Sequence, residues 1–129
     1  MNPAELIARA RRSAASAKVL YDIGDMSGAC NRAYYAMFDA ARAALLAGKE
    51  PVKSELIKTH SGLIAAFSLQ LIKTGRIPTV CGKSLRQVDQ IRLIADYSDE
   101  EPDRETAASS IEQANRFVQA VANYLASPA

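Results

Sequence analysis

The spacing of apolar and polar positions predicts a chain made of five amphipathic helices. Apolar side chains recur at intervals of three and four residues, which is the period of one helix face. The stretches that do so lie between Asn2 and Gly24, between Asp25 and Gly48, and over residues 56–73, 84–97 and 103–126. No stretch alternates with the period of two that a half-buried strand shows. We therefore predict an all-α fold, an antiparallel up-and-down bundle of four to five helices.

The stretch 31–46 (NRAYYAMFDAARAALL) is predicted to be the central helix of this bundle. On a helical wheel it has one face of large apolar side chains and one face made only of alanine. An alanine face lets a neighbouring backbone approach closely, so we expect other helices to cover both faces. The remaining strip is polar and consists of Asn31, Arg32, Tyr35, Asp39 and Arg42. Because packing does not account for this strip, it is the first candidate for a functional surface.

Residues that favour helix ends divide the chain further. Asn2 and Glu5 have the spacing of a capping box, and Gly24 stands where a left-handed residue ends a helix. A loop is predicted over 49–54 and a second connection over 76–82, since each contains proline and glycine or lies beside them. The fourth helix is then expected to begin at Ser84, whose hydroxyl suits the N-cap position.

Composition and charge place limits on the class of protein. With 129 residues, 49% of them hydrophobic and 23% charged, the chain is expected to form a single domain over 1–129. The net charge of +2 is too small to indicate a nucleic-acid binder by itself. Cys30, Cys81 and the single His60 form no ligand pattern, so we expect reduced thiols, no metal and no cofactor. The N-terminus lacks the apolar core of a signal peptide and no run is long enough to span a membrane, which favours a cytoplasmic protein.

Arg92 is a candidate because it lies beside the apolar stripe of its helix, where a charge needs a partner. Asp89, Asp96 or Asp39 could supply the carboxylate. One interpretation is an ion-pair network that ties the second helix to the fourth. The other is a binding role in which the planar guanidinium holds a phosphate.

His60 is the second candidate, since its pKa lies near neutrality and suits a general base. Lys58 and His60 stand at the predicted start of the third helix, a position that favours anions. The alternative is that His60 is a cap or an ordinary surface residue. Tyr35 and Tyr97 are candidates for a hydroxyl that bonds across helices or to a ligand, whereas Tyr34 is assigned to the core.

Three segments together resemble a known family. NRAYYAMFDAARAALL, then KTHSGLIAAF, then RLIADY before a final helix are similar to the small stand-alone prokaryotic members of the HEPN (higher eukaryotes and prokaryotes nucleotide-binding) domain family. The resemblance extends from Ala17 to about Val121 and implies a helical bundle. It also implies a homodimer, and frequent pairing with a minimal nucleotidyltransferase in toxin–antitoxin arrangements.

The resemblance also implies a chemistry, from which this chain departs. Many members are metal-independent ribonucleases that use an Arg followed four to six residues later by a His. Arg92 matches the arginine, but Asp96 and Tyr97 occupy the following positions, and Asp39 stands where the narrower group commonly has His.

The residues and the resemblance together are compatible with two functions. The favoured one is a binding module for a nucleotide, RNA or a partner nucleotidyltransferase within a toxin–antitoxin system. Its candidate ligand-binding residues are Arg92, Asp96, Tyr97, Asn31, Tyr35, Lys58 and His60. The alternative is a metal-independent toxin-type ribonuclease with a non-standard base, for which the catalytic candidates are Arg92, His60 and Asp39.

Overall fold

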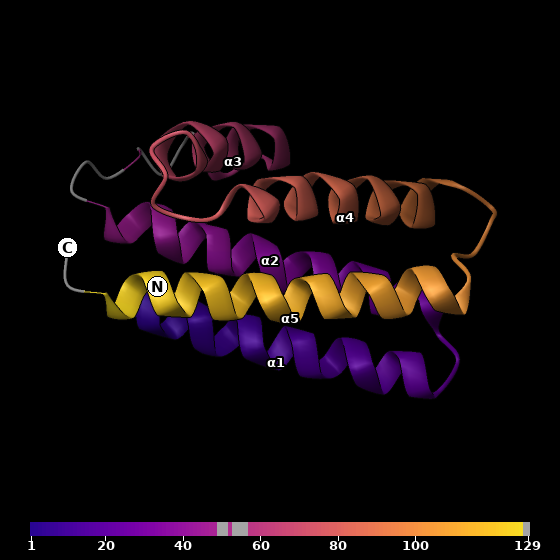
Figure 1. Cartoon of the computed structure of the whole chain (residues 1–129). Helices are drawn as coiled ribbons and strands as arrows, with labels where there is room; N and C mark the ends of the chain where they lie inside the picture. The colour runs from indigo at the N-terminus through magenta and orange to yellow at the C-terminus, as the bar shows by residue number, and fades with distance from the viewer. Residues whose placement is uncertain (49–51, 53–56, 128–129) are drawn as a thin grey trace.

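The chain folds into a helical bundle in the computed structural model (Figure 1). The structure describes residues 1–48, 52 and 57–127, so most of the predicted loop over 49–54 and the predicted helix start at residue 56 lie outside the described residues. The helices are α1 (Pro3–Asp22), α2 (Met26–Ala47), α3 (His60–Phe67), the π-helical turn η2 (Ser68–Ile72), α4 (Thr79–Tyr97) and α5 (Arg104–Ala126). The described residues contain no strand, and the predicted all-α bundle is confirmed.

The long helices alternate in direction along the chain. α1 and α4 run one way and α2 and α5 run the other, while α3 lies beside α2 and α4 near the end of α2 (Figure 1). α2 packs against α1, α3, α4 and α5, and most extensively against α1. The prediction that the stretch 31–46 forms the central helix is therefore confirmed.

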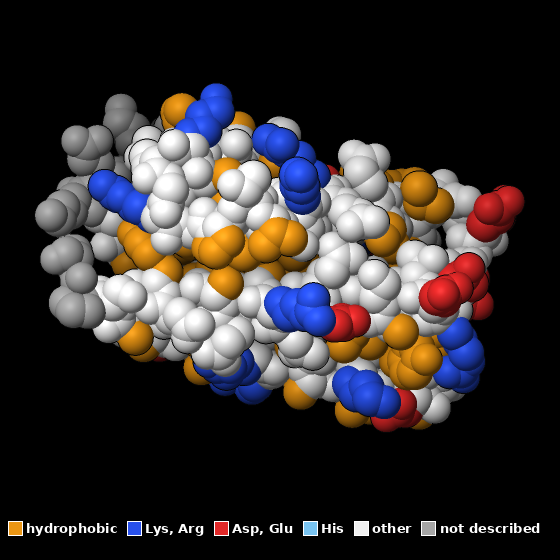
Figure 2. Space-filling model, viewed as in Figure 1, with side chains coloured by type: hydrophobic (Ala, Val, Ile, Leu, Met, Phe, Trp, Pro, Cys, Tyr) orange, Lys and Arg blue, Asp and Glu red, His pale blue; other side chains and the backbone are white. Residues whose placement is uncertain are grey.

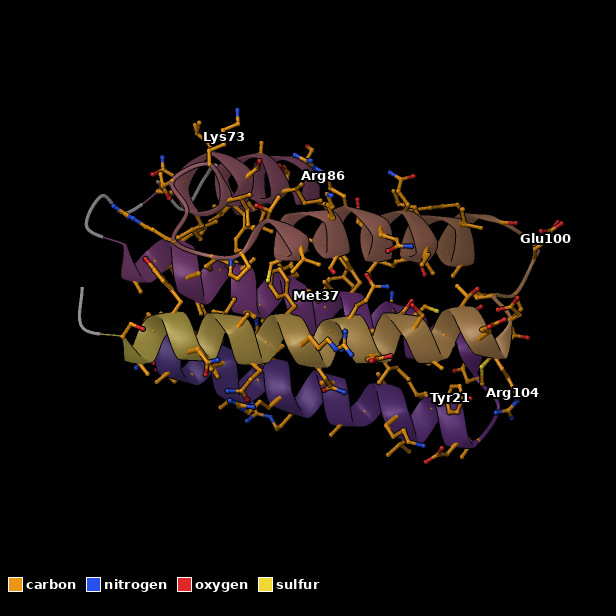
Figure 3. The ribbon with its side chains drawn as sticks, viewed as in Figure 1. Tyr21, Met37, Lys73, Arg86, Glu100 and Arg104 are labelled. Atoms are coloured by element: carbon orange, nitrogen blue, oxygen red, sulfur yellow. The ribbon has the colours of Figure 1, made fainter. Side chains whose placement is uncertain are left out.

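Small side chains allow this central position. The predicted alanine face of α2 is completely buried at Ala29, Ala33, Ala36, Ala40, Ala43 and Ala44. α1 adds Ala10 and Ala17, also fully buried, so the backbones of the two helices can lie close together. The larger side chains of α2 fill the rest of the interior, where Met37 lies between α4 and α5 in the view of Figure 3.

Local signals define several helix ends as predicted. The Asn2 side chain accepts a hydrogen bond from the backbone N–H of Glu5 at 2.8 Å, and the Glu5 carboxylate completes the capping box. Gly24 has φ +91°, a left-handed conformation that costs a residue with a Cβ atom. These contacts satisfy backbone groups that a helix end leaves without partners.

The start of α4 differs from the prediction. The helix begins at Thr79 with Pro78 as N-cap, five residues before Ser84. Pro78 suits this place because a backbone N–H at the start of a helix has no acceptor within the helix, so the absence of an N–H in proline costs no hydrogen bond. Gly82 lies inside α4, where a Cβ atom would lie 3.2 Å from Cγ1 of Ile72. The glycine therefore permits close packing against η2 and does not break the helix.

Charge is distributed unevenly over the surface. Acidic side chains gather at the end of the molecule where α4 leads into α5 (Figure 2), and Asp99, Glu100 and Glu101 are exposed there. Glu101 also accepts a hydrogen bond from the backbone N–H of Met26 at 3.1 Å, which joins this connection to the start of α2. Among the helices described, none combines the length and apolarity needed to cross a membrane.

Candidate functional site

Tyr34 is the point at which three helices meet. Its side chain is fully buried on α2, and its hydroxyl oxygen lies 2.7 Å from Nδ1 of His60, the first residue of α3. On its ring, Cζ of Arg92 from α4 lies 4.5 Å from the centroid, within the range of a cation–π contact. Tyr34 thus joins His60 and Arg92, which are 32 residues apart in the sequence.

Aromatic side chains of α2 surround the imidazole. The ring centroid of His60 lies 5.4 Å from that of Tyr34, 5.9 Å from Tyr35 and 5.2 Å from Phe38. Phe38 is a neighbour of both tyrosines on the helix surface because it follows Tyr35 by three residues and Tyr34 by four. The Thr59 hydroxyl accepts a hydrogen bond from the N–H of Gly62 at 3.0 Å, which caps α3 and fixes where His60 begins the helix.

This environment keeps His60 neutral. Burial lowers the pKa of His60 below its ordinary value of 6.5, and the nearby positive charge of Arg92 lowers it further. Asp89 and Asp96 act in the opposite direction without reversing the shift. A neutral imidazole at pH 7 can accept a proton, so His60 has the protonation state that a general base requires.

Arg92 is held by two carboxylates of its own helix. Only 4% of Arg92 is exposed, and its Nη2 lies 2.8 Å from Oδ1 of Asp89 while its Nη1 lies 3.3 Å from Oδ2 of Asp96. Burial opposes the positive charge, but the Asp89 hydrogen bond and charge outweigh it and raise the pKa of Arg92. Nε of Arg92 is buried without a hydrogen-bond partner in the part of the chain that is described.

The connection between α2 and α4 is not a simple ion pair. Nδ2 of Asn31 lies 3.4 Å from Oδ2 of Asp96, and the same carboxylate forms an ion pair with Arg92. The two helices are therefore joined by this hydrogen bond and by the contact of Arg92 with the ring of Tyr34. The predicted ion-pair network exists, but its ion pairs lie within α4.

An open cleft of about 650 Å³ adjoins this cluster, between α3 and α4. Its walls are formed by Thr59, His60, Ser61, Ile64, Ala65, Arg86, Asp89, Gln90, Arg92 and Leu93. Arg86 is exposed and points from α4 towards α3 (Figure 3), where its Nη2 lies 3.4 Å from the hydroxyl of Ser68. Among the described residues Arg86 forms no ion pair, so its charge is available to an anion in the cleft.

Three of the predicted site residues lie outside the cluster. Asp39 was one of three carboxylates named as a possible partner of Arg92, and for Asp39 this is wrong: its two carboxylate oxygens accept hydrogen bonds from Nε and Nη2 of Arg9, both at 2.8 Å. Asp39 is only 5% exposed, so α1 supplies the charge that its burial requires. Lys58 is exposed just before α3, and Tyr97 is 81% exposed at the end of α4.

Tyr34 is a core residue as the sequence indicated, but it also makes the hydroxyl contact that was expected of Tyr35. Tyr35 is half-buried, and the guanidinium of Arg32 lies over its ring, with Cζ 5.1 Å from the ring centroid. Tyr34, assigned to the core, is the residue whose hydroxyl reaches His60. A signal for it was present, because a buried tyrosine needs a partner for its hydroxyl and an aliphatic or alanine-rich core offers none.

Comparison with known proteins places the chain in a family. A model of the HEPN domain matches residues 4–124. The chain is similar to the "UPF0332 protein glr0978" of Gloeobacter violaceus, with 34% identity over 95% of this chain and 94% of the relative. It is also similar to the "Putative toxin MJ0605" of Methanocaldococcus jannaschii, with 34% identity over 90% and 83%, and to a "UPF0332 protein" of Thermotoga maritima, with 33% identity over 88% and 83%. The chain belongs to the HEPN domain family.

Proposed function

We propose that this protein is a toxin-type ribonuclease that uses His60 as its base in place of the histidine missing after Arg92. One observation carries the proposal. The neutral imidazole of His60 borders an open cleft, and Tyr34 couples it directly to Arg92. Two relatives from Methanocaldococcus jannaschii bear the name "Putative toxin", which supports the same class of function.

The chemistry requires a base, a nucleophile supplied by the RNA and a cation near the phosphate. Neutral His60 accepts the proton of a ribose 2′-hydroxyl, and the 2′-oxygen forms a bond to the adjacent phosphorus. The bond from phosphorus to the 5′-oxygen breaks, and that oxygen takes a proton from water. The products are a 2′,3′-cyclic phosphate and a 5′-hydroxyl. This route uses no metal and follows what the family resemblance implies for ribonuclease members.

Arg86 is better placed than Arg92 to receive the phosphate. Both terminal nitrogens of Arg92 already bind carboxylates, and the two negative charges disfavour a further anion beside them. Arg86 is exposed on the wall of the same cleft and has a fork of donors that suits a phosphate. In this proposal Arg92 stabilises the ring of Tyr34 and does not touch the substrate.

A second candidate is a binding module for a nucleotide, RNA or a partner nucleotidyltransferase, without catalysis. The observation that favours it is the pair of carboxylates, Asp89 and Asp96, on Arg92. They neutralise the arginine that ribonuclease members of the family use to steady the phosphate, so binding without cleavage is the natural consequence.

A single experiment separates the two candidates. Purified protein is incubated with RNA in the presence of a chelator, and cleavage and binding are both measured for the wild type, His60→Gln, Arg86→Gln and the control Arg116→Gln. Arg116 is an exposed arginine of α5 that pairs with Glu112 and does not line the cleft. The ribonuclease proposal expects cleavage that His60→Gln abolishes and Arg116→Gln leaves unchanged.

Other outcomes are equally informative. RNA binding without cleavage, weakened by Arg86→Gln and not by Arg116→Gln, contradicts the ribonuclease and supports the binding module. Cleavage that survives His60→Gln contradicts the assignment of the base. Protein that neither binds nor cleaves RNA contradicts both RNA-directed functions and leaves the nucleotide or the nucleotidyltransferase as the ligand to examine by pull-down with the purified partner.

We also propose that the protein is a homodimer that joins through the outer face of α4. Val80, Ile94 and Tyr97 are 64%, 57% and 81% exposed, and their spacing places them on the outer side of the helix. Arg86, which borders the cleft, lies eleven residues before Tyr97 and therefore on the Tyr97 edge of this surface, so a partner there would border the cleft. Light scattering should give a dimer mass for the wild type and a monomer mass for Ile94→Lys. A wild-type monomer at micromolar concentration would contradict the proposal.

A further inference from the structure

One side of α2 carries cationic and aromatic side chains that have no part in the cleft between α3 and α4. Arg32, Tyr35, Phe38 and Arg42 follow one another at intervals of three, three and four residues, so they lie along one side of the helix. All four are half-buried, and we call them the α2 strip. The rise of an α-helix makes the strip about 15 Å long. It has a cation at each end and two aromatic rings between them.

The two arginines of the α2 strip keep their positive charge available. Neither Arg32 nor Arg42 forms an ion pair with any residue that the structure describes. Arg32 donates from Nε and Nη2 to Oδ1 of Asn31, at 3.4 and 3.3 Å, but a neutral amide oxygen does not compensate a charge. Both guanidinium groups therefore have donors and charge for a phosphate.

Carboxylates beside the α2 strip already have cationic partners. Asp39 is 5% exposed and forms its ion pair with Arg9. Asp96, which accepts a hydrogen bond from Asn31, forms an ion pair with Arg92. These carboxylates thus do not cancel the charge of the two arginines of the strip, and the strip is positive along its length.

The aromatic rings of the strip lie beside the proposed base. The ring centroids of Tyr35 and Phe38 are 6.0 Å apart, and that of His60 lies 5.9 Å from the first and 5.2 Å from the second. Aromatic side chains and arginine guanidinium groups are the surfaces on which unpaired nucleobases stack. Since His60 also lines the cleft, the cleft and the α2 strip meet at this residue.

We propose that the α2 strip binds single-stranded RNA, with a base stacked on the ring of Tyr35 and backbone phosphates bound by Arg32 and Arg42. This inference deepens the proposed function, on which it rests for the position of the cleaved bond at His60. The strand then runs from the cleft, past His60, onto α2. The RNA must be single-stranded, because the faces of paired bases are covered by their neighbours in a duplex and cannot stack on a side chain.

Fluorescence anisotropy with a labelled single-stranded RNA tests this surface. The full chain with His60→Gln is the parent protein, so that cleavage does not disturb the titration. Arg32→Gln, Arg42→Gln and Tyr35→Leu are added to it and compared with the controls Arg11→Gln and Tyr35→Phe, and circular dichroism checks each fold. Arg11 is exposed on α1, lies beside α5 and forms no ion pair with a described residue, so its replacement removes the same charge elsewhere.

The salt dependence of binding separates charge from stacking. For a single strand, each phosphate contact contributes about 0.7 to the slope of log affinity against log salt concentration. Arg32→Gln and Arg42→Gln should each reduce the slope by about this amount, whereas Arg11→Gln should not. Tyr35→Leu should keep the slope and weaken binding by at least about fivefold, as expected for the loss of one stacked base. Tyr35→Phe keeps the ring and should bind as the parent does.

A duplex RNA of the same sequence provides a second readout. Because its bases are stacked on one another, Tyr35→Leu should not weaken its binding. An equal loss for duplex and single strand overturns the stacking role of Tyr35, and so does a Tyr35→Leu variant that binds the single strand as tightly as Tyr35→Phe. Salt slopes of Arg32→Gln and Arg42→Gln that equal the slope of Arg11→Gln overturn the phosphate contacts.

The outcome can be separated from that of the proposed function. If the strip variants weaken RNA binding as expected and the wild type does not cleave RNA, the inference stands and the ribonuclease proposal fails. If the wild type cleaves RNA, and Arg32→Gln, Arg42→Gln and Tyr35→Leu without the His60 substitution bind and cleave as Arg11→Gln does, the inference fails while the proposed function stands. A protein that binds no RNA overturns the inference.

Discussion

Asp89 and Asp96 both bind Arg92, yet their removal should have very different consequences. The Arg92 side chain is 5% exposed, that of Asp89 is 12% exposed and that of Asp96 is 30% exposed. Asp89→Ala leaves a buried guanidinium with only its contact to Asp96, which is longer and more exposed to solvent. Breaking a buried pair in this way costs about 3–5 kcal/mol, and the remaining partner places Asp89→Ala near 3 kcal/mol. Asp96→Ala should cost about 1 kcal/mol or less, as for a largely solvated pair.

Urea unfolding followed by far-UV circular dichroism measures both losses. The double variant Asp89→Leu with Arg92→Met removes the buried charge together with its partner, and the Met side chain can still pack on the ring of Tyr34. Because replacing a buried pair with apolar groups is often neutral, the double variant should lie within about 1 kcal/mol of the wild type. Equal losses for Asp89→Ala and Asp96→Ala would contradict the dominant role of Asp89 in pairing with Arg92, as would a double variant no more stable than Asp89→Ala alone.

Three further predictions concern stability. Gly24→Ala should cost about 1 kcal/mol because φ is +91°, whereas Gly48→Ala, at φ −67°, should cost less in the same urea assay; equal losses would contradict the conformational argument. Arg9→Gln leaves the buried carboxylate of Asp39 without its two hydrogen bonds and should cost about 2 kcal/mol, a loss that Arg11→Gln on the exposed side of α1 should not reproduce. Because the folded-state pKa of His60 is lowered, the unfolded chain binds the proton first, so stability should fall as pH drops below about 6.5. His60→Gln should remove that part of the pH dependence, and an unaltered profile would contradict it.

Features encoded by residues close together in the sequence were predictable. The Asn2–Glu5 capping box lies within one helical turn, the left-handed Gly24 follows from its residue type, and the buried faces of α2 follow from the helical period. The start of α4 was predicted wrongly, because proline and glycine were taken as signs of a connection there. Pro78 begins that helix and Gly82 lies inside it, since the close approach of Ile72 from η2 decides what the glycine does.

The candidate site was predicted in part, for a physical reason. His60, Arg92, Asp96 and Asn31 were named from residue type and helix position, and the structure brings them together. A helical wheel gives the direction of a side chain but not the group that a distant helix presents to it. The sequence therefore could not show that Arg9 would form an ion pair with Asp39, or that Tyr34 would contact both His60 of α3 and Arg92 of α4.

The family's missing histidine is the departure that the structure addresses most directly. Asp96 and Tyr97 follow Arg92 where a histidine was expected, and one of them binds the arginine while the other is exposed. In the proposed function His60 of α3 takes its place, where it bonds to the hydroxyl of the tyrosine whose ring lies under Arg92. A spatial substitution of this kind cannot be read from spacing within one helix.

The role of His60 as the base is tested by comparing the pH dependence of RNA cleavage with the titration of His60. Cleavage with a chelator present is followed as kcat/KM over a pH series, and the imidazole of His60 is titrated in the same buffers by NMR. The assignment of His60 as the base predicts that activity falls on the acid side with the pKa of His60, below 6.5, and that His60→Gln has no activity. An acid limb that does not coincide with the His60 titration, or cleavage that persists in His60→Gln, would contradict it.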